Sequence, residues 1–147
     1  MCIRDSLEMF EEERDHPMLG FCVMGGVFSE GIDLTHDRLI GVIVVGTGIP
    51  QVCNDREIVK NYFDQKGMRG FDYAYLYPGM NKVLQAAGRV IRTAEDVGII
   101  VLLDERFRQY SYRRMFPREW EQVVPVTVDT VAKKVERFWD AWLWQQR

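Results

Sequence analysis

The sequence predicts an α/β domain built on a mainly parallel sheet that helices flank. Two runs, residues 39–46 and residues 98–103, are almost continuously apolar. Such runs are typical of strands in a parallel sheet that is covered on both faces. Segments with helical periodicity lie between and after them, and strands that alternate with helices indicate this fold class. With 147 residues, the chain is long enough for one domain with its own core.

The first part of the chain is predicted to contain the end of a helix and a buried strand. Residues 7–15 are acidic with a few apolar positions, as at the end of an amphipathic helix. Residues 19–28 are apolar and rich in β-forming side chains, so we expect a buried strand that Gly25 and Gly26 interrupt. Residues 29–37 are polar and are predicted to form a loop.

The middle of the chain begins with a predicted helix over residues 55–65. Asn54 or Asp55 is a suitable N-cap, and Gly67 lies beyond the helix end, where glycine is common. Residues 70–77 are rich in aromatic side chains, and their pattern leaves both a loop and a short helix open.

Residues 81–92 predict a helix with two different faces, and Pro78-Gly79 before it is interpreted as a break. At about 100° per residue, four polar or small residues fall within roughly 100° of one another. They are Gln85, Gly88, Arg89 and Arg92. The opposite face is apolar and is expected to pack on the sheet. Its residues are Val83, Leu84, Ala86, Ala87, Val90 and Ile91.

The polar face of this helix offers one amide and two guanidinium groups around a glycine. Guanidinium forks match phosphate oxygens in a bidentate manner, so a ligand with several negative charges fits this face. Such a ligand would also offset the repulsion between Arg89 and Arg92, which is about a few tenths of a kcal/mol. A solvated arginine face is the alternative, and the helix alone does not decide between the two.

A glycine-rich segment, residues 25–34, follows the first expected strand. In open α/β sheets, ligands bind outside the carboxyl ends of strands, and glycines there let backbone N–H groups approach phosphate. Asp33 is suited to bind a ribose hydroxyl or to orient an arginine. The alternative is an ordinary polar turn in which Asp33 is a local cap.

The last third of the chain predicts two more helices. Residues 104–116 are charged and aromatic and form a short one. Cations and rings alternate here, a pattern that holds single-stranded nucleic acid, and Arg113 and Arg114 are its candidate contacts. Rings packed on the domain beside solvated cations are the alternative. Residues 130–145 form an amphipathic helix whose apolar stripe is more typical of a core or domain-contact surface. The stripe consists of Val131, Val135, Phe138, Trp139, Trp142 and Leu143.

Residues 99–105 have the pattern of a Walker B strand, an apolar run followed by Asp-Glu. In a motor with a P-loop, that acid would hold Mg²⁺. The sequence contains no G-x-x-x-x-G-K-[ST], so the pattern lacks its context. We therefore expect Asp104 to pair with Arg106 or with an arginine of the 81–92 helix.

Composition excludes several classes of protein. The net charge of −3 gives the surface no general basic field, so any contact with DNA must be local. No apolar run approaches the roughly 20 residues of a membrane span, and there is no secretory signal. Cys2, Cys22 and Cys53 form no CxxC pair, so neither a zinc site nor a disulfide framework is predicted. A reducing, cytoplasmic compartment is expected.

Two segments together resemble a known family. Phe28-Ser29-Glu30-Gly31-Ile32-Asp33 resembles helicase motif V in the DinG/XPD-like branch of superfamily 2. Residues 85–92 match motif VI, Q-x-x-G-R-x-x-R, and the order of the motifs and the strand between them also fit. Residues 72–77 look like the stretch before motif VI in bacterial DinG-like proteins. The resemblance runs from about residue 7 to residue 120.

The resemblance implies a second RecA-like motor domain, spanning residues 7–147 and incomplete at its N-terminal side. Residues 1–6 fit no pattern and are interpreted as a non-native leader. The family couples ATP hydrolysis to movement along single-stranded DNA, so the DNA and the first RecA-like domain are the implied partners. That first domain, absent here, carries the P-loop, the Mg²⁺-binding acid and, in many members, an iron–sulfur cluster. Such a protein would act on the bacterial nucleoid.

The resemblance also assigns roles to residues of this chain. Arg92 would be the main arginine finger toward the γ-phosphate of ATP, with Arg89 and Gln85 assisting. The residues that would border the nucleotide are Gly31, Asp33 and Gly88. The residues that would face the DNA backbone are Gly25, Gly26 and Ser29. No residue of the chain is assigned to a metal.

The sequence leads us to expect that the isolated chain neither hydrolyses ATP nor unwinds DNA, because it has no P-loop. A free-standing module that binds nucleotide or nucleic acid without catalysis is the alternative function. A nonfunctional truncated product is a third.

Overall fold

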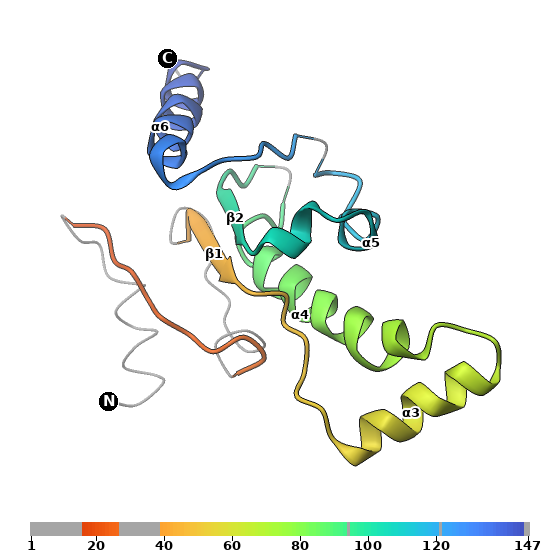
Figure 1. The fold of residues 1–147 in the computed structure, drawn as a ribbon. Coiled ribbons are helices and arrows are strands. Elements are labelled where there is room, and N and C mark those ends of the chain that lie inside the picture. Colours follow the sequence, from red (N-terminus) through yellow and green to blue (C-terminus); the bar gives the residue numbers. More distant parts are fainter. Residues whose placement is uncertain (1–15, 27–38, 94, 121, 146–147) are drawn as a thin grey trace, which may run out of the picture. The chain divides into compact units, whose positions relative to one another are not determined.

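The computed structural model describes residues 16–26, 39–93, 95–120 and 122–145. The chain divides into two compact units, residues 1–115 and residues 116–147. In chain order, the first unit contains β1 (Gly41–Val45), α3 (Asn54–Gln65), the π-helical segment η2 (Asp72–Leu76), α4 (Tyr77–Ala87), β2 (Ile99–Leu103), the 3-10 helix η3 (Glu105–Arg108) and α5 (Tyr110–Arg113) (Figure 1). The second unit contains α6 (Val128–Gln145). The expected helix end at 7–15 and the loop at 29–37 lie outside the described residues.

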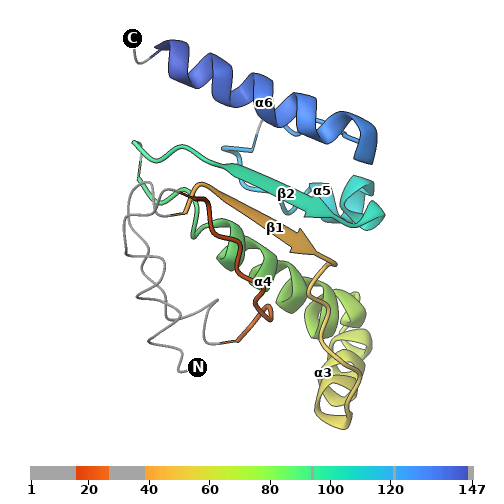
Figure 2. The same cartoon turned by 90° about the vertical axis from the view of Figure 1, so that its left-hand side faces the viewer.

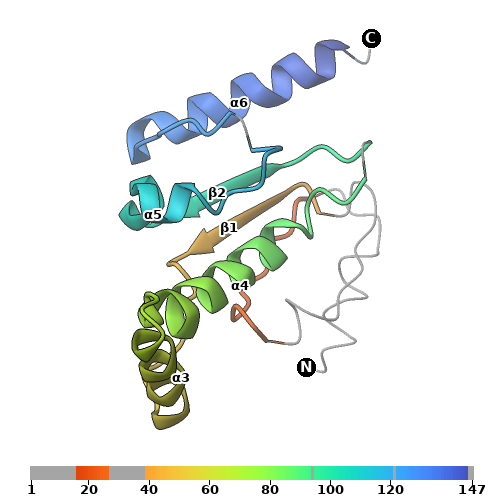
Figure 3. The same cartoon turned by 90° about the vertical axis from the view of Figure 1, so that its right-hand side faces the viewer.

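Within the described residues, β1 and β2 form a parallel two-stranded sheet, which confirms the predicted fold class and both of these strands. The predicted cover on both faces was wrong, because Val44 is the one buried residue of the two strands and Val45 is 68% exposed. The register places Gly41 opposite Ile99 and Val45 opposite Leu103. Figures 2 and 3 show the two strands pointing the same way, with α4 running alongside β1. Parallel strands cannot be joined by a tight hairpin, and here the connection runs through α3 and α4.

The core lies where α4 packs on the sheet. Residues at helical spacing along η2, α4 and the turn after it are all buried. They are Leu76, Met80, Val83, Ala87 and Val90. This confirms the apolar face that the sequence predicts for Val83, Ala87 and Val90. The prediction was wrong for Ile91, which is 44% exposed because the helix has already ended.

The helical option for residues 70–77 is the correct one, since η2 passes directly into α4. The interpretation of Pro78-Gly79 as a break was therefore wrong. Pro78 is the second residue of α4, and the carbonyl oxygen of Ala74, four residues before it, accepts Arg56 Nη1 at 2.9 Å, which compensates for the N–H that proline lacks. A Cβ on Gly79 would lie 2.8 Å from the carbonyl oxygen of Thr47 and 2.9 Å from the nitrogen of Ile49. Glycine thus lets the helix approach the backbone that follows β1.

The predicted 55–65 helix is present as α3, but its N-cap is Cys53 rather than Asn54 or Asp55. Cys53 makes no side-chain cap bond; its carbonyl oxygen accepts the N–H of Glu57 at 3.1 Å. The predicted helix end is confirmed, because Gly67 has φ of +73° just past the cap residue. Glycine adopts this left-handed conformation without steric cost.

The predicted buried strand at 19–28 was wrong over its described part, residues 19–26, which contains no strand. Leu19, Phe21 and Val23 are 71%, 93% and 81% exposed. Residues 24–26 instead form a turn, in which Gly26 donates its N–H to the carbonyl oxygen of Val23 at 3.0 Å. Apolar, β-prone sequence becomes a strand only when a neighbouring strand pairs with it, and no described strand does so here.

The short helix predicted at 104–116 is present as two short pieces, η3 and α5. The amphipathic C-terminal helix is confirmed as α6, which begins two residues earlier than predicted. At its start, Thr130 Oγ1 accepts the N–H of Thr127 at 2.9 Å. No helix in the described part of the chain is long and apolar enough to cross a membrane.

Candidate functional site

The polar segment 85–92 is a helix end followed by a turn, and not the continuous helix that the sequence predicts. Helix α4 stops at Ala87, with Gly88 as its C-cap. The N–H groups of Arg89 and Val90 then bond three residues back, at 3.3 Å to Ala86 and 3.1 Å to Ala87. The prediction that Gln85, Arg89 and Arg92 share one helical face is therefore wrong, because the two arginines lie beyond the end of α4.

Val90 holds this turn against the sheet. Its side chain is 4% exposed, and a Cβ placed on Gly98 would lie only 2.2 Å from Val90 Cγ1. The same Cβ would lie 3.0 Å from the carbonyl oxygen of Ile40. Gly98 therefore provides the space that Val90 occupies. Arg89 and Arg92, on either side of this buried residue, are both partly exposed.

Asp96 fixes the backbone after Val90. Its Oδ2 accepts the backbone N–H of Arg92 at 2.9 Å and that of Thr93 at 2.8 Å. Thr93 Oγ1 in turn accepts the N–H of Glu95 at 3.3 Å. Hydrogen bonds from backbone N–H groups to a carboxylate are charge-assisted and strong. The main chain at Arg92 is thus held by a side chain four residues later.

Residues 89–92, which we call the arginine segment, lie where both strands of the sheet begin. Ile99 donates its N–H to the carbonyl oxygen of Ile40 at 3.0 Å, and Val90 packs at this same point, next to Gly98. The first turn of α4, by contrast, packs on Thr47, after the end of β1. Helix α4 therefore runs antiparallel to β1 and delivers its last residues to the amino end of the sheet.

The Gly25-Gly26 turn lies toward the other end of α4. A Cβ on Gly25 would be 3.3 Å from Lys82 Cε, and Met24 Sδ lies 3.3 Å from the Cβ position of Gly48, just past β1. This turn and the arginine segment therefore occupy different ends of the sheet. Three further candidates, Ser29, Gly31 and Asp33, lie outside the described residues.

The prediction that Asp104 pairs with Arg106 is confirmed. Arg106 Nη2 lies 2.6 Å from Asp104 Oδ2, and Nε and the backbone nitrogen of Arg106 each donate to Oδ1 at 2.9 Å. The side-chain hydrogen bonds from Arg106 lower the pKa of Asp104 below its ordinary value. Asp104 thus follows the last residue of β2 and is the N-cap of η3.

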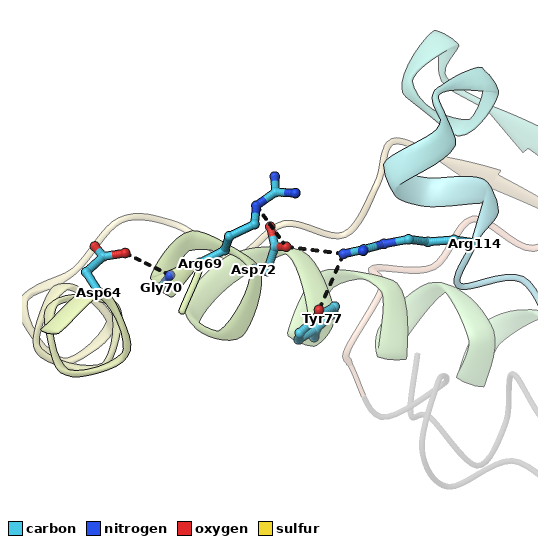
Figure 4. A network of polar contacts seen from close by, with 6 residues as sticks. All are labelled: Asp64, Arg69, Gly70, Asp72, Tyr77 and Arg114. Carbon is cyan, nitrogen blue, oxygen red and sulfur yellow. Dashed lines mark hydrogen bonds and ion pairs between the residues drawn. The ribbon is translucent and has the colours of Figure 1, made fainter. Parts of the chain in front are cut away.

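Arg113 and Arg114 differ in their surroundings although they are neighbours. Figure 4 shows Arg114 pointing toward Asp72 of η2 and Tyr77, the first residue of α4. Its Nη2 lies 3.2 Å from Asp72 Oδ2 and 3.4 Å from the hydroxyl of Tyr77. Arg69 Nε approaches the same Asp72 oxygen at 3.3 Å. The Asp72 side chain is only 2% exposed, so these cations neutralise a buried charge. Arg113 is exposed.

Sequence reasoning missed Asp72. The stretch that contains it was treated as either loop or helix, so its burial could not be predicted. The available signal was Arg69, which stands three residues before it at the spacing of a helical ion pair. The other partner, Arg114, directly follows α5; it is 42 positions away in sequence and carries no local signal.

Arg114→Ala is expected to lower the free energy of unfolding by about 2 kcal/mol, because Asp72 would keep only one of its two cations. This figure is below the usual loss for a buried pair, since the Arg114 side chain is 37% exposed. Arg113→Ala is the matched control and should change stability by no more than about 0.5 kcal/mol. Urea denaturation of both purified variants measures the difference, and equal losses would contradict the role given to Arg114.

Metal-binding side chains do not gather within the described residues, which contain no group of three or more His, Cys, Asp or Glu suited to an ion. Cys22 and Cys53 are both exposed free thiols. An iron–sulfur cluster needs several cysteine ligands held together, and these two do not provide such a set.

Comparison with known proteins identifies the family. Residues 3–123 match the family model described as Helicase C-terminal domain. The chain is 25% identical over 138 residues to the "Probable ATP-dependent helicase MJ0942" of Methanocaldococcus jannaschii, covering 86% of this chain and 21% of that protein. It is 30% identical over 126 residues to ATP-dependent DNA helicase chl1 of Schizosaccharomyces pombe, covering 77% and 15%. It is 34% identical over 89 residues to ATP-dependent DNA helicase DinG of Photobacterium profundum, covering 59% and 13%.

The chain thus spans no more than 21% of the length of these three relatives. The family match, in contrast, covers most of the chain and includes β1, the arginine segment and β2. The relatives include DinG itself and chl1, which agrees with the resemblance of the two motifs. The chain belongs to the helicase C-terminal domain family, in its DinG/XPD-like branch.

Proposed function

We propose that this chain works as the second motor domain of an ATP-dependent DNA helicase. In a longer parent protein, a P-loop domain would hold ATP and Mg²⁺, and this domain would present Arg92 to the γ-phosphate. Arg89 and Gln85 would assist, and Gly88, Gly31 and Asp33 would border the nucleotide. Any iron–sulfur cluster of the parent would belong to the other domain.

The observation that supports this proposal most is the fixed backbone between the two arginines. Val90 is buried against Gly98, and Asp96 holds the N–H of Arg92. A fixed backbone leaves only the side-chain torsions of Arg92 to be ordered when its guanidinium meets a phosphate, and preorganised charge lowers the barrier to phosphoryl transfer. Positive charge supplied across a domain cleft is the arginine finger of nucleotide hydrolases, worth about 10³–10⁵ in rate.

The second part of the proposal concerns DNA. We propose that the turn at Gly25 and Gly26, with Ser29 beyond it, faces the backbone of single-stranded DNA. Exposed Arg113 is a further contact, because it has an exposed cation beside aromatic residues. Arg114 is less suited, since its Nη2 already contacts Asp72. ATP and DNA would then act at different ends of the sheet, so that closure of the ATP cleft could shift the DNA-facing turn.

The experiment that tests the proposal compares the chain with its full-length parent. The purified chain is expected to show no ATP hydrolysis and no unwinding, because its sequence contains no P-loop to hold the triphosphate. The full-length parent should hydrolyse ATP when single-stranded DNA is added. DNA-stimulated turnover by the chain alone would overturn the proposal. Nucleotide binding without turnover in the parent would favour a binding module instead.

A further inference from the structure

At the end of the arginine segment, backbone N–H groups donate to one side-chain carboxylate instead of to the carbonyl oxygens of a preceding helical turn. The last backbone bonds of the turn are those of Arg89 and Val90 to residues of α4. The N–H groups of Arg92 and Thr93 both point instead to a single oxygen, Asp96 Oδ2, at 2.9 and 2.8 Å. These two bonds fix the direction in which the main chain leaves the buried Val90.

Asp96 is itself well placed to hold a fixed position. It lies two residues before Gly98, which packs against both Val90 and the start of β1. Its backbone N–H also contacts the carbonyl oxygen of Thr93 at 3.4 Å, which closes the turn on itself. The carboxylate therefore connects the start of β2 with the backbone of Arg92.

We propose that Asp96 is a positioning residue for Arg92, a role that rests on the function proposed above. Asp96 would act through the main chain of Arg92 and would touch neither ATP nor DNA. A finger must reach its phosphate within a small error, because misplacement by about 1 Å can lower the rate of an enzyme about 10²-fold. Loss of the carboxylate releases two N–H groups and lets the backbone of Arg92 move.

The test uses the full-length parent and measures DNA-stimulated ATP hydrolysis. Asp96→Ala should lower kcat by about 10- to 100-fold while KM for ATP changes by less than about threefold, since the finger acts on the transition state. Asp96→Asn should fall between this variant and the wild type, because an amide oxygen accepts the same N–H groups without the charge. Glu95→Gln, which removes a neighbouring exposed carboxylate, is the matched control and should leave kcat unchanged.

A double variant separates positioning from general damage to the fold. If Asp96 acts only through Arg92, the Arg92→Ala and Asp96→Ala double variant should be no slower than Arg92→Ala alone. A double variant slowed by the product of the two single effects would overturn the proposal. So would Asp96→Ala and Asp96→Asn variants that both keep kcat within about twofold of the wild type. If Asp96→Ala does not fold, as judged by its melting temperature, the Asp96→Asn variant and its own double with Arg92→Ala decide the question.

The two proposals fail in different ways. Should Arg92→Ala leave ATP hydrolysis intact, the role proposed for Arg92 is wrong, whatever Asp96 does. Should Arg92→Ala abolish hydrolysis while the Asp96 variants remain active, only the positioning role is wrong.

Discussion

Arg92→Ala in the full-length parent is expected to lower kcat for DNA-stimulated ATP hydrolysis by about 10³-fold or more. The guanidinium would meet the charge that develops on the γ-phosphate, and alanine leaves that charge without a partner. Arg92→Lys should recover only a small part of the rate, because a single ammonium lacks the planar fork that binds two oxygens. Steady-state kinetics with saturating single-stranded DNA provides the measurement.

The fold should survive this substitution. Arg92 is partly exposed, and the hydrogen bond to Asp96 comes from its backbone rather than from its side chain. Because alanine keeps the N–H that Asp96 accepts, we expect Arg92→Ala to remain folded, with a cooperative thermal transition. Turnover of this variant within about fivefold of the wild type would mean that Arg92 is not the finger.

Gly98→Ala is expected to lower the free energy of unfolding by about 3 kcal/mol. The added Cβ would lie 2.2 Å from Val90 Cγ1 and 3.0 Å from the carbonyl oxygen of Ile40, so Val90 would have to move. Because Val90 lies between Arg89 and Arg92, the same change should also reduce ATP hydrolysis in the parent. Urea denaturation of the purified domain measures the loss of stability.

Two further variants test the geometry behind this prediction. Gly41→Ala, at the start of the neighbouring strand, meets its nearest atom at an ordinary 3.4 Å and should cost much less. Val90→Ala removes the methyl group that clashes with the new Cβ at position 98. The free energy of unfolding lost by the double variant, Val90→Ala with Gly98→Ala, should therefore be smaller than the sum of the two single losses. Additive losses would show that Val90 and Gly98 do not share one space.

The regular elements of the fold were predictable because their signals are local. The apolar runs that became β1 and β2 are rich in the β-branched residues typical of strands, and α6 has the periodicity of an amphipathic helix. The pairing of Asp104 with Arg106 was also predictable, since only one residue separates them. The family resemblance rested on residues 28–33 and 85–92 together, and the family match covers both segments.

The shape of the arginine segment was not predictable from its helical periodicity, because contacts with residues that follow position 92 decide it. Residues 81–92 fit a helical wheel well, yet the helix ends at Ala87. What stops it is the burial of Val90 beside Gly98 and the capture of two N–H groups by Asp96. No periodic pattern in residues 81–92 contains this information.

Two other errors have the same origin. The run at 19–28 has the composition of a strand, but composition cannot specify a partner strand. Pro78-Gly79 has the composition of a turn, yet a donor from Arg56 compensates for the N–H that proline lacks, and Gly79 serves close packing on Thr47. In each case tertiary contacts override the local preference.

If Arg92 stabilises the transition state of ATP hydrolysis, its loss should weaken the binding of a transition-state analogue far more than the binding of ATP itself. The full-length parent and its Arg92→Ala variant would be titrated with ADP plus aluminium fluoride and, separately, with a non-hydrolysable ATP analogue. We predict that Arg92→Ala weakens binding of the aluminium fluoride complex by about 10²-fold or more and binding of the ATP analogue by only a few-fold. Equal weakening of both ligands, or none of either, would show that Arg92 does not stabilise the transition state.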